Sequence, residues 1–131
     1  QGVVSSIDRV RKEIEDGKDA LRQWVKDECP STFFEAANSK AIGERYGKII
    51  AWAGKQNRYR PEALAEFATV ADGWLVAYAA EHELTVVTQE VAAPESKKEV
   101  KVPDACEAFK VPCIDTFEML EKLKVSFTWK P

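Results

Sequence analysis

Four acidic residues, Glu13, Asp72, Glu90 and Asp104, have the type and the sequence context of a metal-dependent catalytic site. Glu13 and Asp72 each share the apolar face of a predicted helix, because apolar residues follow them at helical spacing. Glu90 comes just after residues 84–88, a predicted strand, at the end where open α/β sheets place their sites. Carboxylate oxygens suit Mg²⁺ and Mn²⁺, and two such ions activate water in phosphodiester hydrolysis.

Each of these carboxylates also has a simpler interpretation. Glu13 lies among other charged residues and could belong to a solvated helix face. Asp72 and Asp104 stand at the starts of predicted helices, so either could be a helix N-cap. Glu90 could be an exposed loop residue. On spacing alone, metal binding is the less favoured interpretation.

Basic residues in two predicted loops could hold the phosphates that flank a scissile bond. A solubilising surface loop is the alternative interpretation. These residues are Lys97, Lys98 and Lys101 in the loop over residues 91–103, and Arg58 and Arg60 just before Pro61.

Composition narrows the class of protein. The 131 residues, 45% of them hydrophobic and 31% charged, predict one globular domain over residues 1–131. A net charge of -3 excludes nucleic-acid binding by bulk positive charge. A single histidine excludes a multi-histidine metal site, and three cysteines without C-x-x-C spacing indicate no zinc ribbon, so we expect a cytoplasmic protein. The longest apolar run, residues 74–80, is far shorter than the roughly 20 residues of a membrane span.

The order of predicted elements indicates an α/β fold. Strands separated by helices form a parallel sheet with helices on both faces. No segment looks like a long central strand, so we expect the sheet to be incomplete. Helices are predicted over residues 7–17, after Asp19, and over 33–37, 39–56, 61–67, 74–81, 104–109 and 117–123, and strands at 3–4, 84–88, 111–114 and 125–129.

Four segments resemble the C-terminal half of PIN-domain proteins, and most closely a prokaryotic branch related to the VapC toxins. They are ADGWLVAYA at residues 71–79, TVVTQE at 85–90, VPDAC at 102–106 and VPC at 111–113. The helix over residues 7–17 also resembles the PIN helix in which an acid precedes an apolar residue and a glycine. The likeness covers most of the chain.

The resemblance implies a three-layer α/β/α sandwich with a parallel sheet, and a ribonuclease that depends on Mg²⁺ or Mn²⁺. Glu13, Asp72 and Glu90 would be its catalytic residues and metal ligands, with Asp104 as an auxiliary ligand. The usual PIN residue at the position of Glu90 is aspartate. RNA would be the substrate and an antitoxin protein the partner, as in a type II toxin–antitoxin pair, and a homodimer is allowed.

One departure from the family pattern is large. PIN domains begin with an apolar strand that ends in an aspartate and lies in the middle of the sheet, and residues 3–4 instead resemble the second strand. We therefore expect the domain to be N-terminally incomplete, with a gap between the strand at residues 3–4 and the strand at 84–88. The alternative function is a non-catalytic PIN-like module that binds protein or RNA.

Two further expectations concern geometry. The strands at residues 84–88 and 111–114 should pair in parallel, because a crossover helix connects them. Glu13, Asp72 and Glu90 should converge to within roughly 10 Å, the distance that two bridged cations and their ligands span. Crowding of like charges should then raise the pKa of at least one of these carboxyl groups.

Overall fold

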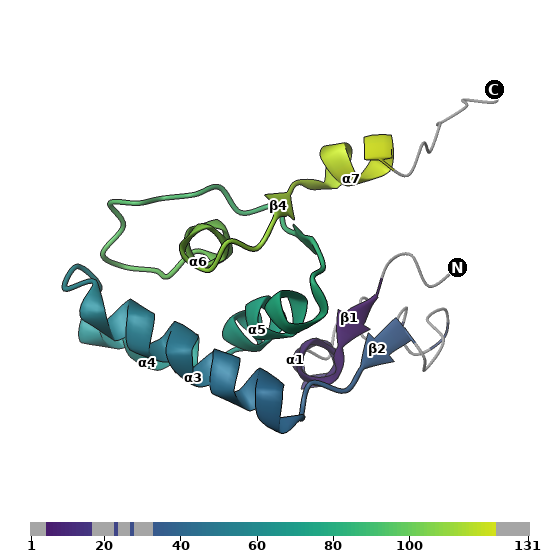
Figure 1. The fold of residues 1–131 in the computed structure, drawn as a ribbon, viewed down its shortest axis with the longest axis horizontal. Helices are drawn as coiled ribbons and strands as arrows, with labels where there is room; N and C mark the ends of the chain where they lie inside the picture. Colours follow the sequence, from purple (N-terminus) through teal and green to yellow (C-terminus); the bar gives the residue numbers. More distant parts are fainter. Residues whose placement is uncertain (1–4, 17–22, 24–26, 28–32, 123–131) are drawn as a thin grey trace.

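A computed structural model describes residues 5–16, 23, 27 and 33–122 of the chain. Predictions for residues 3–4 and 125–129, and most of the helix predicted after Asp19, lie outside these residues. The described elements alternate between helices and short parallel strands, which confirms the mixed α/β class (Figure 1). The helices are α1 (Asp8–Asp16), α3 (Lys40–Lys55), α4 (Pro61–Thr69), α5 (Asp72–His82), α6 (Val102–Ala108) and α7 (Thr116–Lys122).

Helix ends follow the local signals of the sequence closely. The N-cap of α3 is Ser39, whose Oγ accepts a hydrogen bond from the Ile42 N–H at 3.2 Å. Pro61 occupies the first turn of α4, where its missing N–H costs nothing. Before α7, the Asp115 carboxylate accepts the Glu118 N–H at 2.8 Å and the Glu118 carboxylate accepts the Asp115 N–H at 3.3 Å. This reciprocal pair is a capping box.

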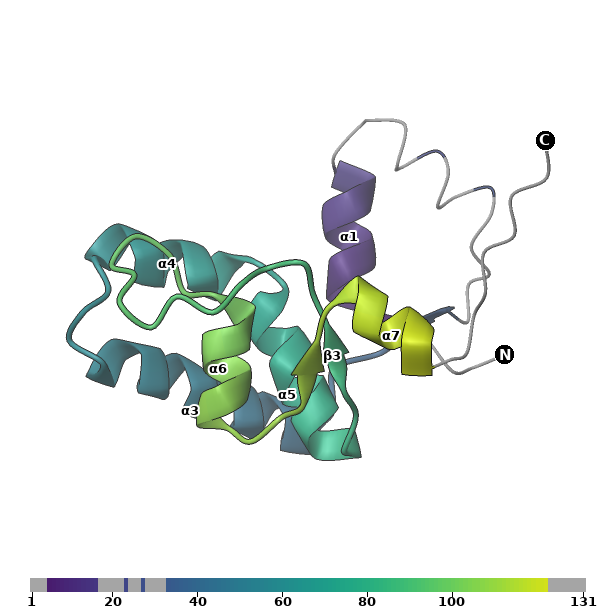
Figure 2. The same cartoon turned by 90° about the horizontal axis from the view of Figure 1, so that it is seen from above.

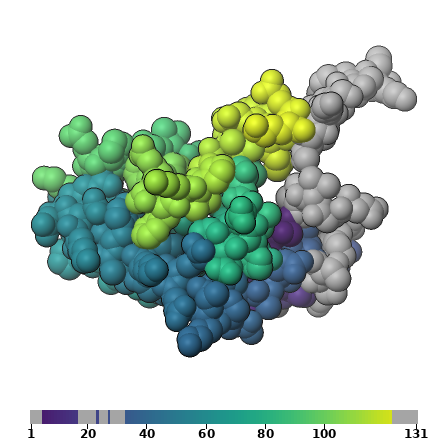
Figure 3. Space-filling view, in the orientation of Figure 1, coloured from purple at the N-terminus to yellow at the C-terminus, as the bar shows by residue number. Residues whose placement is uncertain are grey.

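Helix α5 lies at the centre of the described structure. It packs against α3 and α4 on one side and against α6 on another, as Figures 1 and 2 show from two directions. The buried apolar side chains form a cluster that includes Ile42 and Ile49 from α3 and Val76 from α5. In the space-filling view, α7 (yellow) projects from the upper side of the molecule (Figure 3). The first residue of α5, Asp72, therefore belongs to a helix that other helices pack against on more than one side.

Within the described residues, four strands of two residues each form two separate parallel pairs. β1 (Ser6–Ile7) pairs with β2 (Phe34–Glu35), and β3 (Val86–Val87) pairs with β4 (Cys113–Ile114). The predicted parallel pairing of the strands near residues 84–88 and 111–114 is confirmed. Among the described residues, β1 and β3 are not hydrogen-bonded to each other.

A groove of about 470 Å³ lies between β1 and β3. Its lining comes from both strands, from α5 and from α7, and includes Ile7, Leu75, Val86 and Met119. Helix α5 contributes Leu75, Tyr78 and Ala79 to one side of this groove. The gap predicted beside residues 3–4 stays a prediction, because those residues lie outside the described part of the chain.

The sequence interpretation is wrong at two places. The helix predicted over residues 33–37 is instead the strand β2, and Ile7, predicted on a helix face, is a fully buried residue of β1. Both errors have one cause, because β1 and β2 pair with each other across a sequence separation that a local pattern cannot register.

Candidate acidic site

Asp72 is the first residue of α5, and its side chain is half-buried. The N-cap of this helix is Ala71, and no side-chain capping hydrogen bond is made there. Asp72 is therefore not the N-cap of α5, which was the alternative role that the sequence allowed. Burial raises the pKa of Asp72 from 3.8 to about 6, and the negative charges of Glu90, Glu13 and Glu66 contribute to this rise.

Glu13 connects α1 to the start of α5. Its carboxylate Oε2 accepts a hydrogen bond from the Ala71 N–H at 2.6 Å. Ala71 immediately precedes Asp72, so this bond places a second carboxylate beside the first. Although the residue is largely exposed, it is more than part of a solvated helix face.

Glu90 lies just beyond β3, where the backbone leaves the sheet. The Thr88 N–H donates to the Ile114 carbonyl at 3.0 Å, which extends the pairing of β3 with β4 up to this point. The Glu90 carboxylate Oε1 then accepts the Val102 N–H at 2.8 Å. This bond fixes the side chain at the start of α6, and its charge acts on Asp72.

Asp104 has a different set of contacts. It is the one polar or charged residue that is buried in the described part of the chain, at 6% exposure. Its carboxylate Oδ2 accepts the Ala93 N–H at 3.0 Å and lies 4.0 Å from the Arg58 guanidinium. The N-cap of α6 is Lys101, so Asp104 is not a cap. These contacts hold the loop after Glu90 against the start of α6.

Among the predicted phosphate-binding residues, Arg58 is already engaged. Its guanidinium donates to the Ala93 carbonyl at 3.1 Å and to the Tyr59 hydroxyl. The Arg60 N–H donates to the Lys97 carbonyl at 2.9 Å, which brings the two predicted basic segments together. Arg60, Lys97 and Lys98 are exposed.

Lys101 is the N-cap residue of α6 and is partly exposed. Its Nζ is 2.5 Å from the Glu99 carboxylate. The hydrogen bond to Glu99 raises the pKa of Lys101, and the charges of Glu90 and Asp104 add to the effect. A cation is therefore placed beside Glu90.

Glu66, on α4, is the acid that sequence reasoning missed. Its charge is one of the three that raise the pKa of Asp72. The signal available in the sequence was the short connection between the helices predicted over residues 61–67 and 74–81. That connection brings the last turn of the first helix beside the start of the second.

The acidic groups have the chemistry of a divalent-cation site, because carboxylate oxygens are the ligands that Mg²⁺ and Mn²⁺ prefer. Negative charge accumulates at Asp72, and a cation would relieve it. In the part of the chain that the structure describes, no three acidic, histidine or cysteine side chains stand close enough together to hold one ion. The donor chemistry fits, whereas the present side-chain positions do not enclose a metal.

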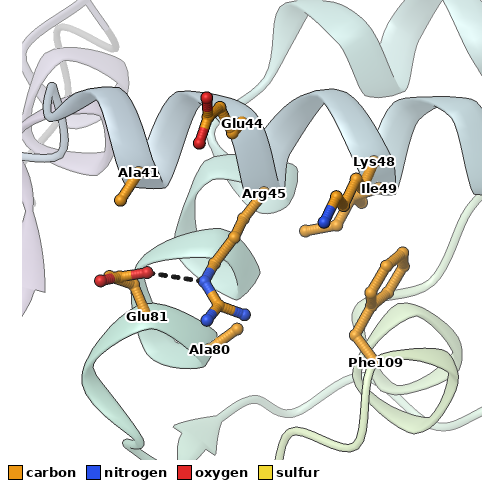
Figure 4. Close-up of a pocket in the computed structure, with 8 residues that line it drawn as sticks. All are labelled: Ala41, Glu44, Arg45, Lys48, Ile49, Ala80, Glu81 and Phe109. Atoms are coloured by element: carbon orange, nitrogen blue, oxygen red, sulfur yellow. Dashed lines mark hydrogen bonds and ion pairs between the residues drawn. The ribbon is translucent and has the colours of Figure 1, made fainter.

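A second concave region lies on another side of α5 (Figure 4). This pocket of about 230 Å³ is lined from α3, α5 and Phe109, and an Arg45–Glu81 ion pair of 2.7 Å closes part of it. Glu81 is nine residues beyond Asp72, about 13 Å along the helix. None of the predicted acids lines this pocket.

The cysteines within the described residues are unreactive in character. Cys106 is fully buried, and burial raises the pKa of its thiol and that of Cys113. Both thiols therefore stay protonated near neutral pH, as expected for apolar filling of a core.

The fold and the site define a mixed α/β protein in which the charges of acidic residues from α1, from α4 and from the segment after β3 act on one half-buried carboxyl group, that of Asp72 on α5. The chain belongs to the family described as Domain of unknown function (DUF4411), whose model matches residues 1–127. No curated protein and no solved structure matches the chain. Within the described residues, no helix combines the length and the apolar character needed to cross a membrane.

Proposed function

We propose that the protein is a PIN-type endoribonuclease that hydrolyses RNA phosphodiesters with Mg²⁺ or Mn²⁺, as the toxin of a type II toxin–antitoxin pair. The observation that supports the activity most strongly is the half-buried carboxyl group of Asp72, whose pKa is raised by burial and, to a smaller extent, by the charges of three other acids. Functional sites are enriched in carboxyl groups with a perturbed pKa, and the pKa of Asp72 is about 6. The toxin role and its antitoxin partner are proposed from the resemblance alone, as are the cytoplasmic location and the complete three-layer sandwich.

The acids have distinct parts in this proposal. Asp72 is the central ligand, held by the well-packed α5. Glu13 and Glu90 flank it, and each is oriented by a backbone N–H, from Ala71 and Val102 respectively. Each of those carboxylates has a second oxygen that could face a cation. The bound cations would activate water and stabilise the leaving oxygen.

Asp104 stays a candidate auxiliary ligand, with a weaker basis. Its Oδ2 atom is occupied by the Ala93 N–H and by Arg58. We infer that its main contribution is to fix the loop that follows Glu90, which keeps Lys97 and Lys98 on the surface. These two lysines, Arg60 and Lys101 are the groups proposed to bind RNA phosphates.

A non-catalytic binding module is the second candidate function. The observation that favours it is that the described acidic side chains do not enclose a metal as they stand. The basic residues around the loop would then bind RNA or an acidic partner without cleaving it.

Metal titration and RNA cleavage decide between the two functions. We expect Mn²⁺ to raise the melting temperature of the wild-type chain and to activate cleavage of a labelled RNA. Asp72→Asn should abolish both effects. Asp16→Asn, an exposed acid on the same helix as Glu13, is the matched control and should leave both unchanged. If Asp72→Asn cleaves RNA as the wild type does, the catalytic assignment is wrong; RNA binding without cleavage supports the module.

A further inference from the structure

Three side chains from three helices, α1, α5 and α3, form a continuous stack. The Arg9 guanidinium of α1 lies 3.7 Å above the ring of Trp74 on α5. The Trp74 ring also stacks on Tyr46 of α3, with 3.9 Å between centroids and 7° between planes. Cation–π attraction and ring stacking both stabilise this arrangement.

The lower part of the stack is held rigidly. The Tyr46 hydroxyl donates a hydrogen bond to the Ala68 carbonyl at 3.2 Å. Gly73 makes room for the same ring, because a Cβ atom at that position would lie 2.9 Å from Tyr46 Cε1. The Trp74–Tyr46 stack under Arg9 therefore depends on the Tyr46 hydrogen bond and on the absence of a side chain at Gly73.

The charge of Arg9 has no acidic partner among the residues that the structure describes. Arg11, Arg45 and Arg58 each lie within 4.0 Å of a carboxylate, whereas no described carboxylate is that close to Arg9. Stacking uses only the flat face of the guanidinium. Its N–H donors lie in the plane of the group and can bind an anion in two-point fashion.

Arg9 is also tied to the elements that position the acids. It precedes Glu13 by four residues, so the two side chains lie on the same face of α1, one turn apart. Glu13 binds the Ala71 N–H, and Trp74 follows on the same helix, α5. The oriented cation and the carboxylates thus belong to a single junction between α1 and α5.

We propose that Arg9 is a phosphate-binding residue of this site, oriented by the Trp74–Tyr46 stack to hold a phosphodiester group of a single-stranded RNA next to the acids. The inference rests on the proposed function, because it names a substrate contact of the same site. It adds a residue in α1 to the basic residues of the two loops. A guanidinium that is already oriented loses little freedom on binding and suits the two oxygens of a phosphate.

Fluorescence anisotropy tests this proposal by measuring the binding of a fluorescein-labelled single-stranded RNA at equilibrium. The RNA has about twelve nucleotides, a length within the usual site sizes for single strands. EDTA in the buffer prevents cleavage. Arg9→Gln should weaken binding about tenfold and reduce the slope of log K against log salt by about 0.7, the value for one phosphate contact on a single strand. Arg9→Lys should fall between it and the wild type, since the charge is kept but the planar fork is lost. Arg45→Gln, an exposed arginine of the other pocket, is the matched control.

The salt slope separates substrate binding from a purely structural role of the stack, because loss of packing alone would not change it. An unchanged slope and affinity in both Arg9 variants would overturn the proposal, even with cleavage that depends on Mn²⁺ and Asp72. RNA binding that depends on Arg9, without any cleavage, would support the contact and refute the nuclease. A wild-type chain that does not bind RNA would refute both.

Discussion

Replacing Asp72 by asparagine should stabilise the protein at neutral pH, and the effect should depend on pH in a defined way. The folded chain raises the pKa of this carboxyl group from 3.8 to about 6, mainly through burial. A raised folded-state pKa means that the folded protein holds the proton more tightly than the unfolded chain does. The contribution of this group to stability is therefore complete below pH 3.8 and is lost as the pH rises through about 6.

The size of the effect follows from the shift. About two pH units at about 1.36 kcal/mol each set an upper limit of about 3 kcal/mol on the change in free energy of unfolding at neutral to mildly alkaline pH, and solvent screening of this partly exposed side chain lowers the effect below that limit. An asparagine side chain carries no charge at any pH, so the wild type and Asp72→Asn should differ little below pH 3.8 and most well above pH 6. For a chain of this length, the largest difference corresponds to roughly 10 °C in melting temperature.

Urea unfolding at a series of pH values from about 3.5 to about 8, which spans both pKa values, measures this difference directly. Asp16→Asn is the control, because this exposed side chain pairs with Lys12, at 3.7 Å, within the described residues and should change stability by less than about 0.5 kcal/mol at every pH. A second measurement adds Mn²⁺ at the alkaline end of the series. A cation that neutralises the cluster should stabilise the wild type and leave Asp72→Asn unaffected.

Two results would refute the reasoning. If Asp72→Asn destabilises the chain equally at all pH values, Asp72 forms a structural contact and is not a strained carboxylate. If the variant is more stable by the same amount at both ends of the pH series, the gain does not come from ionisation.

Three further predictions concern the packing and the hydrogen bonds around the site. Gly73→Ala should lower the free energy of unfolding by about 1–3 kcal/mol, because the new methyl group collides with Tyr46. Gly47→Ala should raise the free energy of unfolding by up to about 1 kcal/mol in the same urea assay, because a Cβ atom there meets nothing within 4 Å. Glu13→Ala should lower the free energy of unfolding by about 1–3 kcal/mol, because it removes the acceptor of the Ala71 N–H. Glu13→Gln keeps an acceptor oxygen and should lose much less stability. Equal losses in the two variants would contradict the hydrogen bond. Asp104→Ala should release the loop after Glu90, seen as faster hydrogen exchange and proteolysis at residues 91–101 while α3 stays protected.

The sequence predicted the parts of the fold that depend on local chemistry. The helices predicted to begin at residues 39, 61 and 117 correspond to α3, α4 and α7, each of which begins within one residue of the predicted start. A serine hydroxyl, a fixed proline φ angle and a carboxylate act on backbone groups within a few residues. Their effect can therefore be predicted without knowledge of the fold.

The sequence indicated which residues could belong to the site better than it indicated how they are arranged. Asp72 emerged from the helical spacing of its apolar neighbours, and Glu90 from its place after a strand. Neither pattern could show that Glu66 of α4 also acts on Asp72, because that effect depends on how two helices meet. Nor could it show that Arg58, predicted to bind RNA, is occupied by the loop it supports.

Local sequence signals were thus sufficient for most helix boundaries, for the parallel pairing of β3 with β4 and for the choice of candidate acids. Tertiary contacts alone decided that residues 34 and 35 form a strand, that Ile7 is buried in another, and that Asp72 holds its proton up to about pH 6. The physical reason is the range of the forces involved. Caps and turns act over one helical turn, whereas strand pairing, desolvation and the repulsion between carboxylates depend on segments that the chain brings together from dozens of residues apart.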